Sequence, residues 1–316
     1  MPPAKKARTD TNFPEIGEIK YEGPESTNPL AFKYYNADEV ILGKKMSEWC
    51  RFAVCYWHTW RGNGADIFGL GGTLIRPWDG ADMDAHLKRV DVHFEFCQKL
   101  GVEYYCFHDR DVSPEGATVA ETEANFDVVA EKLLAKQKET GVKLLWGTSN
   151  LFSHKRYMHG GPTNPDPEVV CMAAAQIKKC LDVTKMLGGE NFVMWGGRDG
   201  YQSLLNTDYA KEQENYATFI KAVLKYCDEI GFKGQLLLEP KPREPAAHQY
   251  NFDAETTLGF LDRWGLTDRC SLNLEANHGT LAGHSGEHEV EAAASRGKAS
   301  PHRDSAHRTL CTALAH

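Results

Sequence analysis

The feature that most constrains the fold is a repeated alternation between short apolar runs and longer amphipathic stretches. Six short runs are predicted to be strands, at residues 52–57, 102–107, 142–146, 191–195, 236–239 and 270–275. The stretches that follow them carry apolar residues three or four positions apart and predict helices at 83–100, 119–140, 169–187, 209–230, 254–264 and 287–295. Such alternation predicts an α/β fold, as a doubly wound sheet or a (β/α)8 barrel.

The polar residues of this pattern gather where the predicted strands end. They are His108, Asp109, Asp111, Thr148, Trp195, Glu239, Glu275 and His278. In a barrel the carboxyl ends of the strands converge on one face, whereas an open sheet spreads them along a line. No Gly-x-Gly-x-x-Gly motif follows a predicted strand, which weakens the dinucleotide-binding alternative. The sequence therefore favours a TIM-type (β/α)8 barrel, here incomplete with about six β/α units.

The clearest of the predicted strands lies in Gly234-Gln-Leu-Leu-Leu-Glu-Pro-Lys-Pro242. Three consecutive leucines are typical of a strand that is buried on both faces, as in a parallel sheet. The prolines end the strand because they cannot donate to the ladder. Glu239 is therefore placed at the carboxyl end of a buried strand, with Lys241 just beyond it. Taken alone, these two residues would be read as a solvated ion pair.

A second carboxylate changes that interpretation. Glu275 ends the next predicted strand, and His278 follows three residues later. Oxygen ligands with one imidazole suit Mg²⁺, Mn²⁺ or Co²⁺ better than a sulfur-rich zinc site. An isolated Glu-x-x-His motif would be a solvated pair, but the neighbouring Glu239 favours a shared metal site.

Two further groups of residues indicate chemistry on a small polar molecule. His108 lies close in sequence to Asp111, and a carboxylate can hold a histidine in one tautomer as a general base. Local ion pairing with Arg110 is the alternative. Three tryptophans near strand ends could simply fill the barrel, or could form flat walls for a sugar; they are Trp57, Trp146 and Trp195.

Composition narrows the partners and the compartment. The net charge is −8, without a basic stripe, which argues against a nucleic-acid partner. No apolar run reaches the roughly 18 residues of a membrane helix. The nine cysteines are scattered, and no Cys-x-x-Cys pair occurs, which predicts reduced thiols. Together with a start that lacks the apolar core of a secretory signal, this predicts a cytoplasmic protein.

Several motifs, taken in order, resemble xylose isomerase in its longer form with an N-terminal extension. They are Trp57-His-Thr, Phe107-His-Asp-Arg-Asp111, Trp146-Gly-Thr, Arg156-Tyr-Met-His-Gly160, Trp195-Gly-Gly-Arg-Asp-Gly-Tyr201, Leu237-Leu-Glu-Pro-Lys-Pro242 and Asn273-Leu-Glu-Ala-Asn-His278. The resemblance runs from about Tyr21 to Lys298. It implies a homotetrameric barrel enzyme that interconverts D-xylose and D-xylulose, and D-glucose and D-fructose. It also implies a hydride shift and two divalent metal ions, Mg²⁺, Mn²⁺ or Co²⁺.

The same resemblance assigns roles to individual residues. It implies that His108 assists ring opening, that Asp111 orients this histidine and that Lys241 polarises the carbonyl oxygen of the sugar. It places Glu239 on a structural metal, Glu275 between both metals and His278 on the catalytic metal. The residues that would contact substrate are Trp57, Thr148, Trp195 and Phe68, the last reaching a neighbouring subunit.

The chain is predicted to consist of an N-terminal arm at 1–49, a partial barrel catalytic domain at 50–298 and a divergent tail at 299–316. The tail has no strand-length apolar run and lacks the aspartates that the family pattern implies, so it is predicted to be disordered and is interpreted as a reading-frame or splice divergence. The run around Phe68 also departs from the family pattern.

The first alternative is therefore an inactive, truncated homologue that lacks part of the metal site and could join complete subunits as a defective partner. Another metal-dependent barrel, such as a phosphoesterase, is a further alternative.

Overall fold

The computed structural model of the chain describes residues 11–65 and 71–296. Its centre is a parallel sheet of six strands in the order β10-β8-β6-β5-β4-β3. The strands are β3 (Ala53–Cys55), β4 (Tyr104–His108), β5 (Lys143–Thr148), β6 (Asn191–Met194), β8 (Gln235–Leu238) and β10 (Cys270–Leu272). Each predicted strand is present, and each pairs with the next one along the chain, as in a (β/α)8 barrel that is not closed over the described residues.

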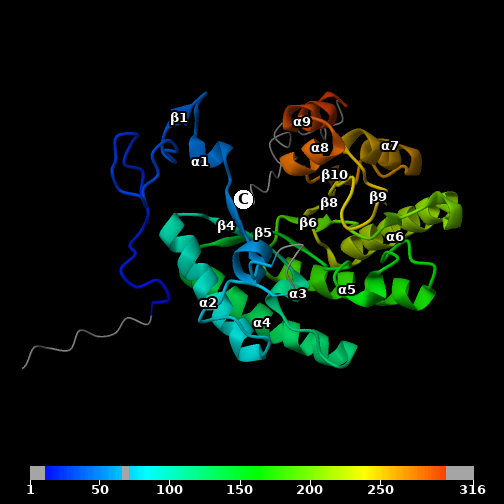
Figure 1. Ribbon diagram of the computed structural model, residues 1–316, viewed down its shortest axis with the longest axis horizontal. Coiled ribbons are helices and arrows are strands. Elements are labelled where there is room, and N and C mark those ends of the chain that lie inside the picture. The colour runs from blue at the N-terminus through cyan, green and yellow to red at the C-terminus, as the bar shows by residue number, and fades with distance from the viewer. Residues whose placement is uncertain (1–10, 66–70, 297–316) are drawn as a thin grey trace, which may run out of the picture.

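Helices flank this sheet on its outer side, as Figure 1 shows. The long ones are α2 (Met83–Leu100), α4 (Val119–Thr140), α5 (Pro167–Met186), α6 (Tyr209–Ile230), α7 (Ala254–Trp264) and α9 (Gly286–Ser295). Four of them begin and end at the predicted residues, because side-chain caps and glycines mark their ends. Gly101 and Gly231, for example, follow helices in the left-handed conformation that favours glycine. A short helix that was not predicted, α8 (Ala276–Ala282), packs with α9 beside β10.

The strands are buried on both faces, as the leucine run predicts. Leu236 and Leu238 belong to the large core between sheet and helices, whereas Leu237 belongs to a smaller cluster on the inner face. Val193 and Cys106 take part in the same inner cluster. Since successive side chains of a strand point to opposite faces, this inner layer fills the bottom of the sheet's concave side.

The remaining elements are short and lie outside the main sheet. They are β1 (Val40–Ile41), β2 (Lys44–Lys45), α1 (Met46–Trp49), the π-helical turn η1 (Trp57–Arg61), α3 (Asp109–Val112), η2 (Lys155–Tyr157), β7 (Gly200–Tyr201), η3 (Leu204–Asn206) and β9 (His248–Gln249). Two of them, η1 and α3, follow β3 and β4 directly. They turn the chain at the carboxyl ends of these strands and so position the residues that come next.

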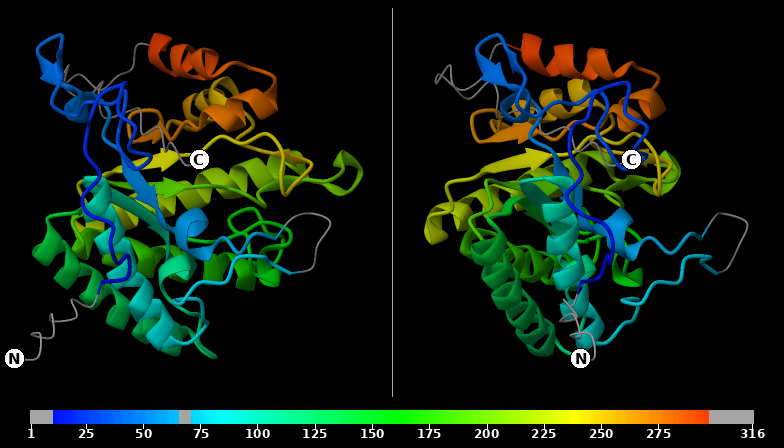
Figure 2. Two further views of the ribbon diagram at one scale, coloured as in Figure 1. Left: turned by 60° about the vertical axis from the view of Figure 1, so that its left-hand side comes forward. Right: turned by 90° about the vertical axis from the view of Figure 1, so that its left-hand side faces the viewer.

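The segment that begins at residue 11, dark blue in Figure 2, passes along the outside of α2 before it reaches β1, β2 and α1. Phe13 packs against Trp78 with ring centroids 5.8 Å apart, and Ile19 donates its backbone N–H to the carbonyl of Lys99. Phe68 and the predicted tail at 299–316 lie outside the described residues.

Two general expectations can be compared with the described part of the chain. Its eight cysteines are all free thiols, which agrees with the prediction of reduced cysteines. Among the described helices, none is both long and apolar enough to cross a membrane.

Candidate active site

A cavity of about 740 Å³ opens at the carboxyl ends of the strands. Every predicted site residue within the described part of the chain lines it: Trp57, His108, Asp111, Thr148, Trp195, Glu239, Lys241, Glu275 and His278. These residues are more than 200 positions apart at the extremes of the sequence, and the parallel sheet brings them together because its strand ends meet at one face.

At one end of the cavity, His108 and Asp111 form a close pair. The imidazole Nδ1 lies 2.7 Å from Asp111 Oδ2, and the same carboxylate oxygen accepts the backbone N–H of His108 at 3.3 Å. Burial acts to lower the pKa of His108, but the charge and hydrogen bond of Asp111 outweigh it and raise the pKa. Asp111 thus fixes the ring and leaves Nε2 as the nitrogen available to a substrate.

Aromatic rings surround this histidine. Trp57 and Phe152 both meet the ring of His108 edge to face, with centroids 4.5 and 5.3 Å away. Phe152 in turn contacts Trp195 at 4.3 Å, and Trp57 contacts Trp146 at 5.4 Å. The wall is therefore continuous from His108 to Trp195, and such apolar faces suit the C–H faces of a sugar.

Lys241 joins the aromatic wall to the other end of the cavity. Its Nζ lies 5.3 Å from the centroid of the Trp195 ring, a cation–π distance, and 3.4 Å from Glu244 Oε2. Lys241 follows β8 by three residues, as the sequence predicts. It supplies a positive charge between the tryptophan wall and the carboxylates.

At the far end, Glu239, Glu275 and His278 come together from β8, the end of β10 and α8. One ligand atom from each of the three lies within 4.8 Å of those of the other two. Burial and the nearby charge of Glu275 raise the pKa of Glu239 to about 7. Asn273 donates to Glu239 Oε2 at 2.7 Å and so orients the carboxylate.

His278 is held with one nitrogen facing this group. Its Nδ1 lies 2.9 Å from the backbone oxygen of Pro240, a contact that requires Nδ1–H to donate. Its Nε2 then lies 3.4 Å from Glu275 Oε2. Burial, followed by the charge of Lys241, lowers the pKa of His278 to about 4, so the ring is neutral near pH 7.

These donors fit a divalent cation. Two carboxylates and a neutral imidazole with a fixed tautomer form an oxygen-rich ligand set suited to Mg²⁺, Mn²⁺ or Co²⁺. Asn273 Oδ1 is buried without a hydrogen-bond partner beside Glu239, so it offers a further acceptor to a cation or to its water. Within residues 11–65 and 71–296, these three residues form the one such group at the cavity.

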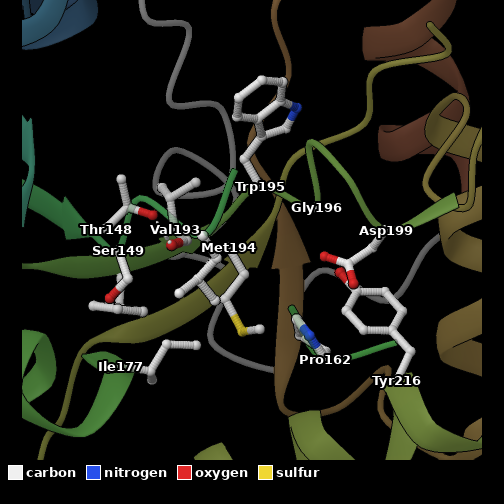
Figure 3. A pocket seen from close by; sticks show the side chains of 12 residues that line it. Thr148, Ser149, Pro162, Ile177, Val193, Met194, Trp195, Gly196, Asp199 and Tyr216 are labelled. Carbon is white, nitrogen blue, oxygen red and sulfur yellow. Dashed lines mark hydrogen bonds between the residues drawn. The ribbon is translucent and has the colours of Figure 1, made fainter. Parts of the chain in front are cut away.

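Thr148 stands between the cavity and the sheet. Its hydroxyl donates to the carbonyl of Val193 at 2.5 Å, which leaves only its oxygen lone pairs for a substrate. Beneath Trp195 a separate small cavity of about 10 Å³ extends from Thr148 to Asp199 and Tyr216, as Figure 3 shows. A sugar does not fit there, so this space belongs to the packing behind the aromatic wall.

Sequence reasoning missed three parts of the site: Phe152, the Asn273 amide and the Pro240 carbonyl. Phe152 lies in a loop without periodic pattern, and a backbone carbonyl has no sequence signature. Asn273 could have been found, because it lies within the predicted strand 270–275, two positions before the predicted metal ligand Glu275.

Fold and site together define a barrel-type α/β protein with a candidate cation site in an aromatic-walled cavity. A profile of the family described as "Xylose isomerase-like TIM barrel" matches residues 94–302, more than half of the chain. The chain belongs to this family. This membership confirms the family resemblance that was predicted from the motifs at the strand ends.

Similar proteins include enzymes named xylose isomerase from bacteria and a plant. That of Sinorhizobium fredii is 55% identical over 281 residues, which cover 89% of this chain and 64% of the relative. That of Hordeum vulgare is 55% identical over 283 residues, with coverages of 89% and 59%. The chain thus spans less than two thirds of the length of these relatives.

Solved structures agree in fold. A 3-keto-D-glucoside 4-epimerase from E. coli is 12% identical with a TM-score of 0.50 and covers 65% of this chain and 70% of its own. A D-allulose 3-epimerase from Methylomonas sp. is 16% identical with a TM-score of 0.50 and coverages of 69% and 65%. At these identities the likeness concerns the fold alone.

Proposed function

We propose that the chain is a metal-dependent aldose–ketose isomerase that interconverts D-xylose and D-xylulose, and also D-glucose and D-fructose. The observation that carries this proposal is the meeting, in one cavity, of the His108–Asp111 pair and the carboxylate–imidazole group, with an aromatic wall between them. Relatives named xylose isomerase at 53–55% identity support it.

The chain's own residues bind and orient the sugar in this proposal. Trp57 and Trp195 cover its apolar faces and exclude water, while the oxygen of Thr148 accepts a hydrogen bond from a hydroxyl. His108 Nε2 exchanges a proton with the sugar during ring opening, since Asp111 holds the other nitrogen. Lys241 Nζ donates to the carbonyl oxygen of the open chain.

Glu239, Glu275 and His278 would hold a divalent cation, which when bound supplies Lewis-acid stabilisation of charge on the sugar oxygens during the hydride shift. The family resemblance implies two such ions, with Glu275 between them. Mg²⁺, Mn²⁺ and Co²⁺ are the candidates, because the donor set is rich in oxygen.

The proposal includes the domain boundaries and the assembly. Residues 1–49 would form an arm and 50–298 the catalytic unit, while the tail at 299–316 lies outside the described residues. The active form would be a cytoplasmic homotetramer.

One observation favours a second candidate, a homologue that binds cation and sugar but does not turn over. Over the described residues, the cavity gathers ligands for one cation, whereas the resemblance implies two. With an incomplete ligand set, charge on the sugar oxygens would be less stabilised and the hydride shift slow.

The test is isomerisation of D-xylose by the purified chain with Mg²⁺, Mn²⁺ or Co²⁺, beside the Glu239→Ala variant. The first candidate predicts turnover by the wild type and none by the variant. Binding of Mn²⁺ and sugar without turnover would support the second candidate. A wild type that is folded but binds neither Mn²⁺ nor sugar would overturn both.

A further inference from the structure

A second group of metal-ligating side chains lies away from the cavity, where α7, α8 and α9 meet. It consists of His284, which follows the C-cap of α8, and of His288 and Glu289 in the first turn of α9. One ligand atom of each lies within 4.8 Å of those of the others. None of these residues lines the candidate active site.

The carboxylate of Glu289 is the unusual member of this cluster. Its side chain is only 5% exposed. Oε2 accepts the backbone N–H of Ala254 at 2.9 Å and so caps the start of α7. Oε1, in contrast, is buried without a hydrogen-bond partner, and His284 Nε2 lies 4.0 Å from it. An unsatisfied buried carboxylate oxygen is costly, and a bound cation would satisfy it.

The two histidines are arranged to complete such a site. Their rings lie 4.2 Å apart with 20° between their planes, at positions i and i+4 of the chain. Asp253 Oδ2 lies 3.3 Å from His284 Nε2, so a second carboxylate borders the same nitrogen. Asp253 itself is fixed because it caps α7 through the backbone N–H of Thr256 at 2.7 Å.

Simple capping explains only part of this geometry. It accounts for Glu289 Oε2 and for Asp253 Oδ1, but it leaves Glu289 Oε1 unpaired and brings two imidazoles beside two carboxylates. Two imidazoles with one or two carboxylates form a ligand set that suits Zn²⁺ and other late transition ions, whereas the cavity group is richer in oxygen.

We propose that His284, His288 and Glu289, with Asp253 beside them, bind a structural transition-metal ion of the Zn²⁺ class. The ion would tie the end of α8 and the start of α9 to the first turn of α7. Because α8 also carries His278 near its start, the ion would hold the helix that presents this residue to the cavity. The site does not depend on the proposed isomerase activity.

The experiment titrates the full chain with Zn²⁺ in competition with a chromophoric chelator. The Glu239→Gln background weakens the cavity site, so that the second site is observed alone. One Zn²⁺ per chain is expected, together with a higher Tm in its presence. Adding His288→Gln or Glu289→Gln should weaken binding at least about tenfold and remove the Tm shift.

Adding His159→Gln, a loop histidine outside the cluster, is the matched control and should change neither quantity. The Glu289→Gln amide can still cap Ala254 through its oxygen, so this variant tests the ligand role without removing the cap. Circular dichroism checks that each variant is folded. Zn²⁺ affinity that is unchanged in both cluster variants, or absent from the folded background protein, would overturn the proposal.

Discussion

The two ends of the cavity differ in the charges that they bring together. At the His108 end, opposite charges meet: Asp111 lies 2.7 Å from the imidazole and raises its pKa. At the carboxylate end, like charges meet: burial and the charge of Glu275 raise the pKa of Glu239 to about 7, and burial keeps His278 neutral. One end is complete within the chain, while the other is arranged for a cation.

The His108 end is therefore preorganised, whereas the carboxylate end depends on a bound cation. Edge-to-face contacts from Trp57 and Phe152 fix the His108 ring, so its position should not change when metal is removed. Glu239, in contrast, can ionise beside Glu275 near pH 7 only at a free-energy cost that a cation offsets. Variants at the two ends should therefore fall into two distinct classes.

The largest effect is expected for Glu239→Gln. Removing one of three ligands should lower the Mn²⁺ affinity at least about 100-fold, and isomerase activity should fall with it. Isothermal titration and a D-xylose assay measure the two quantities. Glu131→Gln, which changes an exposed acid on α4, is the control and should match the wild type. Equal Mn²⁺ affinity in the two variants would remove Glu239 from the cation site.

The next effect concerns pH. The pKa of Glu239 is about 7 in the folded chain, whereas its ordinary value is 4.5. Between pH 4.5 and 7 the folded state therefore binds more protons than the unfolded state. Without metal, the free energy of unfolding should fall by on the order of 2–3 kcal/mol from this group as pH rises from 4.5 to 7. The decrease should end above pH 7.

Urea titrations of the metal-free wild type and Glu239→Gln, compared across this pH range, measure that contribution. The variant should lack it, and saturating Mn²⁺ should remove it from the wild type. Parallel pH profiles for the two metal-free proteins would show that Glu239 is not electrostatically strained.

A smaller effect, confined to the other end, is expected for Asp111→Asn. Loss of the ion pair should lower the pKa of His108, which NMR titration of the imidazole would report. The raised pKa of His108 stabilises the folded wild type below pH 6.5, and this contribution is lost as the pH rises through the raised pKa. The free energy of unfolding of the variant should therefore be about 1.5 kcal/mol lower than that of the wild type below pH 6.5. Unchanged His108 titration would contradict the assigned pair.

The smallest effect is expected for Phe152→Leu. This change removes edge-to-face contacts with His108 and Trp195, worth about 1 kcal/mol. The KM for D-xylose should rise about fivefold, while Mn²⁺ affinity stays within about twofold of the wild type. A change in Mn²⁺ affinity as large as that in KM would mean that the two ends are not independent.

The sequence predicts the helices and strands better than it predicts the contacts between residues of the site. Helices such as Met83–Leu100 and Tyr209–Ile230 begin and end as predicted, because periodicity and C-terminal glycines are local signals. The convergence of Glu239 with Glu275 follows from their places after adjacent parallel strands. These predictions need no knowledge of any particular side-chain contact.

The contacts that decide the chemistry are not local. The bond from His278 to the Pro240 carbonyl and the place of Phe152 depend on how loops fold over the strand ends. His284, His288 and Glu289 are close in sequence, but the contacts that bury Glu289 and bring Asp253 beside His284 depend on how α9 packs against α7. Predicted strand 270–275 also ends early, at Leu272, and Glu275 is the N-cap residue that precedes α8.

The most direct test of the central claim is Mn²⁺ binding, followed by electron paramagnetic resonance, in the wild type, Glu239→Gln and Asp111→Asn. All three should carry His288→Gln, so that the cluster between α8 and α9 does not contribute. The account predicts that Asp111→Asn binds Mn²⁺ as the wild type does, while Glu239→Gln binds it far more weakly. Undiminished binding by Glu239→Gln, or a loss in Asp111→Asn as large as that in Glu239→Gln, would contradict it.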